Sequence, residues 1–182
     1  MNIAQAYFEQ KFENAFLRAK GNEFQTFFER LMGLADHLGL SKASIDAAIS
    51  GNAQRPLYQH LAIAALLMGF ADSESGQAVA AANKRIANIL KKVGDVALDV
   101  DPALLLEAAE QDLYDKLCDA ESSFPTEPEH QLNVLADLRE AVDGFFDDVM
   151  VMAEDEKLRA NRLALLARLR ALFLRLADIS RL

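Results

Sequence analysis

Basic side chains in two short segments are the residues of this chain whose type and spacing suggest binding chemistry. Between Asn83 and Lys92 there are four bases and no acid. From Lys157 onward, seven bases stand against a single acid, Asp178. Lysine and arginine bind phosphates and carboxylates through charge-assisted hydrogen bonds. The two segments are therefore candidate contacts for an anionic ligand, although most charge runs only keep a helix surface solvated.

The rest of the chain is acidic. The 182 residues carry a formal net charge of −9 at pH 7. Asp95 to Glu156 holds nineteen acids against two bases, and we expect carboxylates such as Glu107, Glu110 and Asp115 to solvate an exposed helix. This balance argues against diffuse affinity of the whole protein for nucleic acid and leaves room for a local basic patch.

Motifs of catalysis and of metal binding are missing from the sequence. The three histidines, His37, His60 and His130, stand far apart, and there is no CxxC, HExxH, GxSxG or Walker-type loop. The lone Cys118 excludes an intrachain disulfide and fits a reducing cytosol. Glu127-x-x-His130 occurs once, whereas a di-iron bundle needs two copies. We therefore expect no catalytic residue and no metal site.

Helical periodicity and capping signals predict an all-α protein. Apolar residues make up 52% of the chain, tryptophan is absent, and glycine and proline are scarce. We expect a bundle of about seven to eight antiparallel helices with no sheet. The predicted helices cover 2–20, 23–38, 41–49, 56–70, 73–92, 101–121, 126–152 and 155 almost to the end. A capping box of Thr126 and Glu129 starts the seventh helix, after a linker over 122–128.

The uncharged apolar stretches are short. The longest, 61–71, does not suffice to span a bilayer, and the N-terminus has acids early and no cleavable apolar core. We therefore expect a cytoplasmic protein that does not enter a membrane.

The last predicted helix carries an arginine inside its apolar stripe. The stripe consists of Leu158, Leu165, Leu169, Leu172 and Leu176. Arg162 follows Leu158 by four residues and must snorkel or find a carboxylate. An aspartate of the preceding helix, Asp147, Asp148 or Asp143, is the expected partner, which makes Arg162 and Asp147 a structural clamp. In the alternative interpretation, Arg162 projects into a cleft and contacts a ligand.

Two segments resemble a known family. VDGFFDDVMVMAEDEKLRANRLALLARLRALFLRLADIS, residues 142–180, resembles the C-terminus of the β subunit of bacterial heterotetrameric glycyl-tRNA synthetase. AAANKRIANILKK, residues 80–92, resembles that family's other distinctive segment. Arg55-Pro56-Leu57 and the acidic helix after Asp101-Pro102 fall in the matching order. The resemblance covers 45–182, and earlier residues fit loosely.

The resemblance implies an all-helical anticodon-binding domain of the DALR type. Asp155 to Arg159 matches that motif in degenerate form. The resemblance implies that the DALR-like domain covers 51–182. The helical segment over 1–50 matches the family only weakly, and we expect both parts to form one compact unit. Family β chains are several times longer, and this chain begins where the family polypeptide would already be far advanced, so we expect either a fragment of a longer β chain or a free-standing piece. The catalytic site of the ligase, with its ATP and Mg²⁺, is expected outside this chain, which needs no cofactor of its own.

The implied function is binding of glycine tRNA through its anticodon. The expected partners are this tRNA, the synthetase α subunit and the remainder of the β subunit, and not DNA. Two helices are expected to form one cationic strip that holds phosphates or stacks on a base, made of Lys84, Arg85, Lys91, Lys92, Arg159, Arg168 and Arg175. In the alternative interpretation the domain is mainly an assembly element, whose final helix docks onto the α subunit or the rest of the β chain.

Overall fold

All regular structure in the described part of the chain is helical. The computed structural model describes residue 33, residues 36–51 and residues 55–182. Its α-helices and two short 3-10 helices are α3 (Lys42–Gly51), α4 (Leu57–Ala71), α5 (Glu74–Val93), η1 (Pro102–Leu104), α6 (Ala108–Ser122), α7 (Pro128–Asp137), α8 (Arg139–Asp148), α9 (Glu156–Leu174) and η2 (Ile179–Arg181). The predicted all-α class is confirmed. The helices predicted over 2–20 and most of 23–38 lie outside the described residues.

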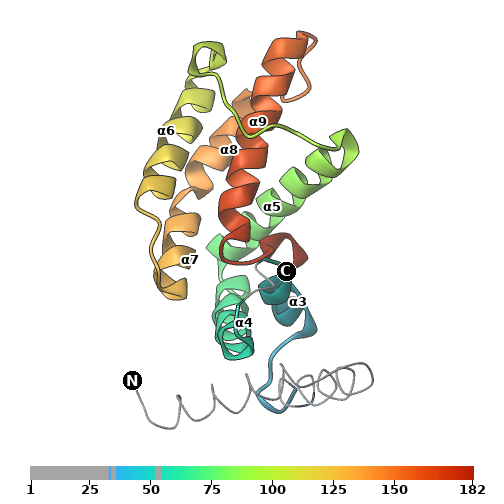
Figure 1. Ribbon diagram of the computed structural model, residues 1–182, viewed down its shortest axis with the longest axis vertical. Helices are drawn as coiled ribbons and strands as arrows, with labels where there is room; N and C mark the ends of the chain where they lie inside the picture. Colours follow the sequence, from blue (N-terminus) through green and yellow to red (C-terminus); the bar gives the residue numbers. More distant parts are fainter. Residues whose placement is uncertain (1–32, 34–35, 52–54) are drawn as a thin grey trace.

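Helix α9 lies at the centre of the bundle. It packs against α5 and α6, while α3 and α4 form a pair next to the C-terminal residues (Figure 1). The segment between α5 and α6 passes across α9 on its way from one side of the bundle to the other (Figure 1). Side chains of α9 supply much of the core, including Leu165, Leu166, Leu169 and Phe173, all at most 2% exposed. The basic and the acidic helices therefore share one apolar core.

Specific polar contacts fix the two ends of α9. The Asp155 carboxylate accepts hydrogen bonds from the backbone N–H groups of Lys157 and Leu158, at 2.8 and 3.1 Å, as expected of an N-cap. Beyond Leu174 the chain turns, and Arg55 donates hydrogen bonds to the carbonyl oxygens of Arg175 and Leu176. These contacts satisfy backbone groups that a helix terminus leaves unpaired.

The C-terminal turn is fixed against α3. The backbone N–H of Asp178 donates to the Ala47 carbonyl at 2.8 Å. A Cβ atom on Gly51 would lie 2.5 Å from the Cα atom of Ala177, which is too close for any side chain. Glycine at position 51 thus permits the end of α3 to touch the chain after α9.

Three predicted helices have other bounds in the structure, and the last of them, α9, ends at Leu174 and not near the end of the chain. The predicted 101–121 helix begins as η1, capped by Asp101, and α6 starts only at Ala108 behind a capping box of Glu107 and Glu110. The predicted 126–152 helix is divided at Leu138 into α7 and α8. Leu138 is buried, so packing of both halves decides the local path there over helix propensity. Glu127, and not Thr126, is the N-cap residue of α7.

No helix among the described residues is both long and apolar enough to cross a membrane.

Candidate nucleic-acid interface

Helix α5 has one buried and one exposed side. Ser73 caps it by accepting a hydrogen bond from Gly76 N–H at 2.9 Å. Val79, Asn83 and Ile86 repeat at helical spacing and are buried, each at most 3% exposed. The four bases predicted on this helix all lie on exposed positions: Lys84, Arg85, Lys91 and Lys92. Burial of one side thus orients the cations toward solvent.

The lysines of α5 have no partner within the described part of the protein. Lys84, Lys91 and Lys92 form no hydrogen bond or ion pair with any described residue, and no acid occurs between Gln77 and Lys92. The guanidinium of Arg85 lies 4.0 Å above the Phe146 ring of α8, a cation–π contact. These charges are therefore available to an anionic ligand. We call Lys84, Arg85, Lys91 and Lys92 the α5 cation face.

Arg168 of α9 is engaged with α6. Its Nε lies 3.0 Å from both Glu121 carboxylate oxygens, and a guanidinium nitrogen also bonds Glu121. The same side chain approaches the Cys118 sulfur at 3.5 Å and the Tyr114 ring at 5.4 Å. The hydrogen bond to Glu121 raises the pKa of the Arg168 guanidinium above its ordinary value, although burial lowers it. Arg168 thus clamps α9 to α6.

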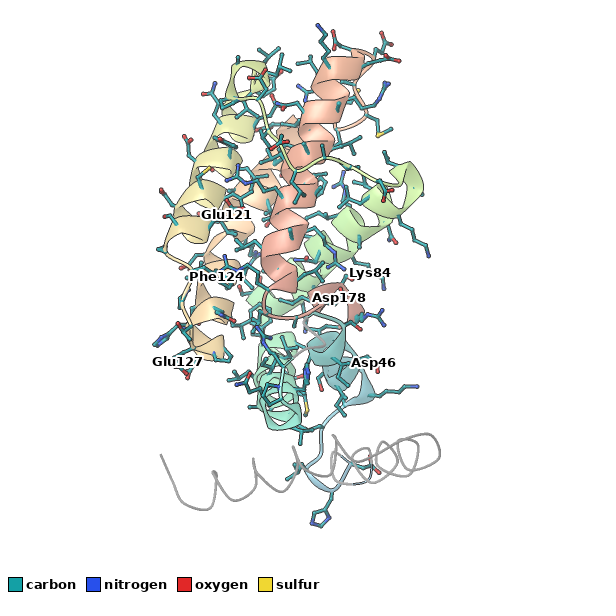
Figure 2. The ribbon with its side chains drawn as sticks, in the orientation of Figure 1. Asp46, Lys84, Glu121, Phe124, Glu127 and Asp178 are labelled. Carbon is teal, nitrogen blue, oxygen red and sulfur yellow. The ribbon has the colours of Figure 1, made fainter. Side chains whose placement is uncertain are left out.

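The other two predicted arginines of α9 also contact the protein itself. The guanidinium of Arg175 lies 4.2 Å above the Phe124 ring. Arg159 donates to the Ala153 carbonyl at 2.8 Å and lies 3.6 Å from Glu156. Lys84 lies on one side of α9, whereas Glu121 and Phe124 lie on the other (Figure 2). Arg168 and Arg175, which contact Glu121 and Phe124, therefore lie on another side of α9 than Lys84, and the seven predicted bases do not form one strip.

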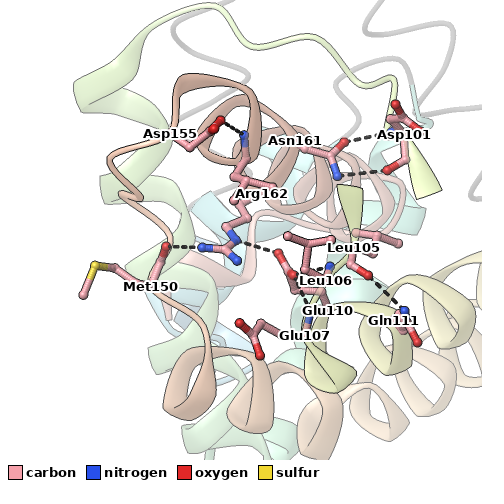
Figure 3. A network of polar contacts seen from close by, with 11 residues as sticks. Asp101, Leu105, Leu106, Glu107, Glu110, Gln111, Met150, Asp155, Asn161 and Arg162 are labelled. Atoms are coloured by element: carbon pink, nitrogen blue, oxygen red, sulfur yellow. Dashed lines mark hydrogen bonds and ion pairs between the residues drawn. The ribbon is translucent and has the colours of Figure 1, made fainter. Parts of the chain in front are cut away.

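Arg162 is buried and bridges separate segments, but its partner differs from the predicted one. Its Nε donates to the Glu110 carboxylate at 2.6 Å, and a guanidinium nitrogen donates to the Met150 carbonyl at 3.0 Å (Figure 3). The exposed Asp147 forms no part of this contact. The two charged side chains are 7% and 0% exposed. The aspartate partner was expected because α8 precedes α9 in sequence, whereas packing brings the start of α6 against Arg162.

Glu110 is the polar residue that the sequence interpretation missed. Its second carboxylate oxygen accepts hydrogen bonds from the backbone N–H groups of Leu106 and Glu107, both at 2.9 Å. The expectation that Glu110 solvates an exposed helix is wrong. A signal was present, since Glu110 stands three residues after Glu107, the spacing of a capping box. Every polar atom of this carboxylate is thus used within the fold.

A second cluster ties the C-terminal residues to α9. Asp178 accepts hydrogen bonds from Arg170 at 2.6 Å, Ser180 at 2.6 Å and Arg181 at 3.1 Å. Burial raises the pKa of Asp178, but the hydrogen bonds from Ser180 and Arg170 outweigh it, so its pKa lies below the ordinary value. Nearby, burial lowers the pKa of His60, whose Nδ1 lies 3.1 Å from the Ala48 carbonyl oxygen.

Metal-binding side chains do not cluster in the described part of the chain. No three or more His, Cys, Asp or Glu residues are placed there to hold an ion. What the arrangement offers chemically is three unpaired lysines beside the ring-stacked Arg85 on α5, and a set of internally engaged arginines on α9.

Residues 79–179 match the family described as DALR anticodon binding domain, and the chain belongs to this family. The match runs from within α5 to the start of η2 and so includes both basic helices.

The relatives of the chain are subunits of one ligase. The chain is 46% identical over 163 residues to the "Glycine--tRNA ligase beta subunit" of Dechloromonas aromatica, covering 85% of this chain and 22% of the relative. It is 53% identical over 117 residues to the subunit of that name from Vibrio vulnificus strain CMCP6, covering 61% of this chain and 17% of the relative. The subunit of Shewanella woodyi is 50% identical over 117 residues, with the same coverage. The chain thus spans about a fifth of the length of the curated relatives it matches.

Proposed function

We propose that this chain is the part of a glycine–tRNA ligase β subunit that binds the anticodon stem-loop of glycine tRNA. Membership of an anticodon-binding family and the names of the relatives support the proposal. The structural observation that carries it is the α5 cation face, with three lysines that have no partner among the described residues. In a protein of net charge −9, such a face is a local positive region that attracts an anion.

The chemistry of an anticodon loop suits this face. Sequence-specific RNA recognition targets single-stranded loops, whose bases are unstacked and can reach side chains. Lys84 and Lys91 are seven residues apart, so both project from the same side of α5, two turns apart. They would hold backbone phosphates along the loop. Lysine suits this role because its ammonium is a point charge without a fixed bonding direction.

A base would stack beside the phosphate contacts. Arg85 is exposed, and one face of its guanidinium already covers Phe146. The opposite face of that planar group can stack on an unpaired base, as guanidinium planes do in RNA complexes. Arg85 and Phe146 would thus form a platform next to Lys84. In this proposal Arg168 stabilises the packing of α9 on α6. Arg159 and Arg175 attract the RNA only by their charge, without direct contact.

In this proposal, the chemical steps of tRNA aminoacylation take place outside this chain. Glycine activation with ATP and Mg²⁺ would take place outside this chain, in the larger remainder of the synthetase. The synthetase α subunit and the rest of the β subunit would be its protein partners.

Binding of a glycine tRNA transcript to the chain tests the proposal. The triple variant Lys84→Gln, Lys91→Gln, Lys92→Gln should bind more weakly at low salt. Its plot of log affinity against log salt should be shallower by about 2, because each phosphate contact on single-stranded nucleic acid contributes roughly 0.7 to the slope. Lys116→Gln is the matched control, since Lys116 pairs with Asp112 on acidic α6. Equal losses from both variants would contradict the proposal.

Anticodon readout requires a separate measurement. A transcript with the second and third anticodon positions replaced should bind several-fold more weakly than the unaltered tRNA, and Arg85→Ala should reduce this difference. If the altered transcript bound equally well at every salt concentration, binding would rest on phosphates alone and anticodon recognition would be refuted.

A further inference from the structure

Exposed apolar side chains occur in two loops of the bundle, the one before α6 and the one between α8 and α9. Leu106 is 62% exposed, Met150 72% and Met152 56%. They are three of the six large hydrophobic residues exposed in the described ranges. Leu106 precedes α6, and both methionines lie between α8 and α9. We call these three residues the methionine rim. Large apolar side chains so exposed on two joined loops offer a surface that a partner can cover.

The buried Arg162–Glu110 pair joins the two loops that carry the rim. Arg162 binds the carbonyl oxygen of Met150, and Glu110 binds the backbone N–H of Leu106 (Figure 3). Both loops are therefore attached to the same ion pair. A loop held in place before binding loses less conformational entropy when a partner covers it. The two loops are thus ordered before a partner binds.

Asn161, next to Arg162, binds the backbone of the segment between α5 and α6. Its side-chain oxygen accepts from Asp101 N–H at 2.8 Å, and its amide donates to the Asp101 carbonyl at 3.1 Å. This pair of bonds anchors the segment that leads to Leu106. A buried ion pair and a buried amide thus fix the loops that carry Leu106 and Met150.

The charges around the rim exclude a nucleic acid and oppose a second copy of this chain. Residues 106–107 and 147–157 contain six carboxylates and one base, Lys157. The carboxylates are Glu107, Asp147, Asp148, Glu154, Asp155 and Glu156, all exposed. Phosphates would be repelled, and two such rims would repel each other. A protein surface with an apolar centre and a basic border complements this arrangement.

We propose that the methionine rim is the surface on which the remainder of a longer synthetase chain docks, through an apolar patch bordered by lysine or arginine. This rests on the proposed function, and the length of the relatives supports it, because about four fifths of each lies outside the matched part. Methionine side chains adapt to an irregular partner surface. The rim orients the domain, while the α5 cation face is left for the tRNA.

Site-specific crosslinking tests this docking in a full-length chain. This chain replaces the matched segment of the Dechloromonas aromatica subunit, and the photoreactive residue p-benzoylphenylalanine replaces Met150. We expect a crosslink to a synthetase peptide outside this chain that contains lysine or arginine. The same probe in place of the exposed His130, on α7, should give at most a tenth of that yield. A crosslink from position 150 to tRNA or to a second copy, or a yield no higher than that from position 130, would overturn the proposal.

Hydrogen exchange supplies an independent readout. In the full-length chain, the amides of 104–107 and 149–153 should exchange at least tenfold more slowly than in the 182-residue chain alone. The double variant Met150→Glu, Met152→Glu should abolish this difference, whereas Met150→Leu, Met152→Leu should retain it. Equal exchange in the two contexts would refute docking.

Binding of glycine tRNA to the 182-residue chain separates this proposal from the proposed function. The Met150→Glu, Met152→Glu variant should bind the transcript within twofold of the unaltered chain. A tenfold loss that Met150→Leu, Met152→Leu does not share would make RNA the occupant of the rim and overturn the docking proposal. Loss of tRNA binding in the α5 lysine variant bears on the proposed function alone.

Discussion

Two basic helices of the same domain differ in what their charges contact. On α9, Arg162, Arg168 and Arg170 form ion pairs with Glu110, Glu121 and Asp178. On α5, Lys84, Lys91 and Lys92 have no partner among the described residues. The difference shows that a run of bases in a sequence has two possible uses. Only the bases that the fold leaves unpaired are free to bind a ligand.

The neighbours of each helix account for this difference. Helix α9 packs against α6, whose carboxylates Glu110 and Glu121 reach its arginines. The exposed side of α5 carries no acid from Gln77 to Lys92. Arginine suits the first use because its planar group forms several directed bonds, and lysine suits the second.

Removal of Arg162 should have the largest effect on stability. Arg162→Ala leaves the Glu110 carboxylate buried without its cation, which costs about 3–5 kcal/mol of unfolding free energy. Urea denaturation measures this, with Arg139→Ala as the control, because Arg139 forms an exposed pair with Asp143 worth at most about 1 kcal/mol. If both variants lost the same free energy, Arg162 would not be the structural clamp described above.

Asp178→Ala should have the second-largest effect on the free energy of unfolding. It removes the carboxylate partner of the partly buried Arg170 and costs about 1–3 kcal/mol of unfolding free energy. The folded pKa of Asp178 lies below the ordinary value, so its contribution is present above pH ~4 and is lost as pH falls through the folded pKa. The difference in urea midpoint between variant and parent should therefore narrow in acid. A difference that stays constant down to pH ~2 would contradict the assigned pKa direction.

Substitution of His60 should have the smallest effect, and it should be seen only in how the free energy of unfolding depends on pH. Burial lowers its folded pKa, so the unfolded chain binds a proton more readily than the folded one. The free energy of unfolding should therefore decrease as pH falls below ~6.5, the ordinary pKa of histidine. His60→Gln should show a weaker decrease between pH ~7.5 and ~5.5. Parallel pH profiles for the two proteins would count against this assignment.

The sequence predicts the elements better than their contacts. The boundaries of α4, α5 and the start of α9 agree with prediction within a residue or two, because Pro56, Gly94 and Asp155 are strong local signals. The division at Leu138 was not predictable in this way, since it depends on the packing of α7 and α8.

The candidate site shows the same limit. The exposed positions of Lys84, Lys91 and Lys92 follow from helical spacing. The partner of Arg162 is Glu110, 52 residues earlier, and that of Arg168 is Glu121, 47 residues earlier. No local spacing encodes such pairs. The sequence therefore predicted one cationic strip that included arginines whose charges are paired within the fold.

Salt-dependent binding of glycine tRNA to two matched variants tests the central claim most directly. One variant carries Lys84→Gln, Lys91→Gln and Lys92→Gln, and the other carries Arg159→Gln, Arg168→Gln and Arg175→Gln, so each loses three charges. Both are compared at a temperature at which circular dichroism shows them folded. The α5 variant should lose about 2 from the salt slope, and the α9 variant should retain the parent slope within roughly 0.5. An equal or larger loss in the α9 variant would contradict the assignment of the RNA-binding surface to α5.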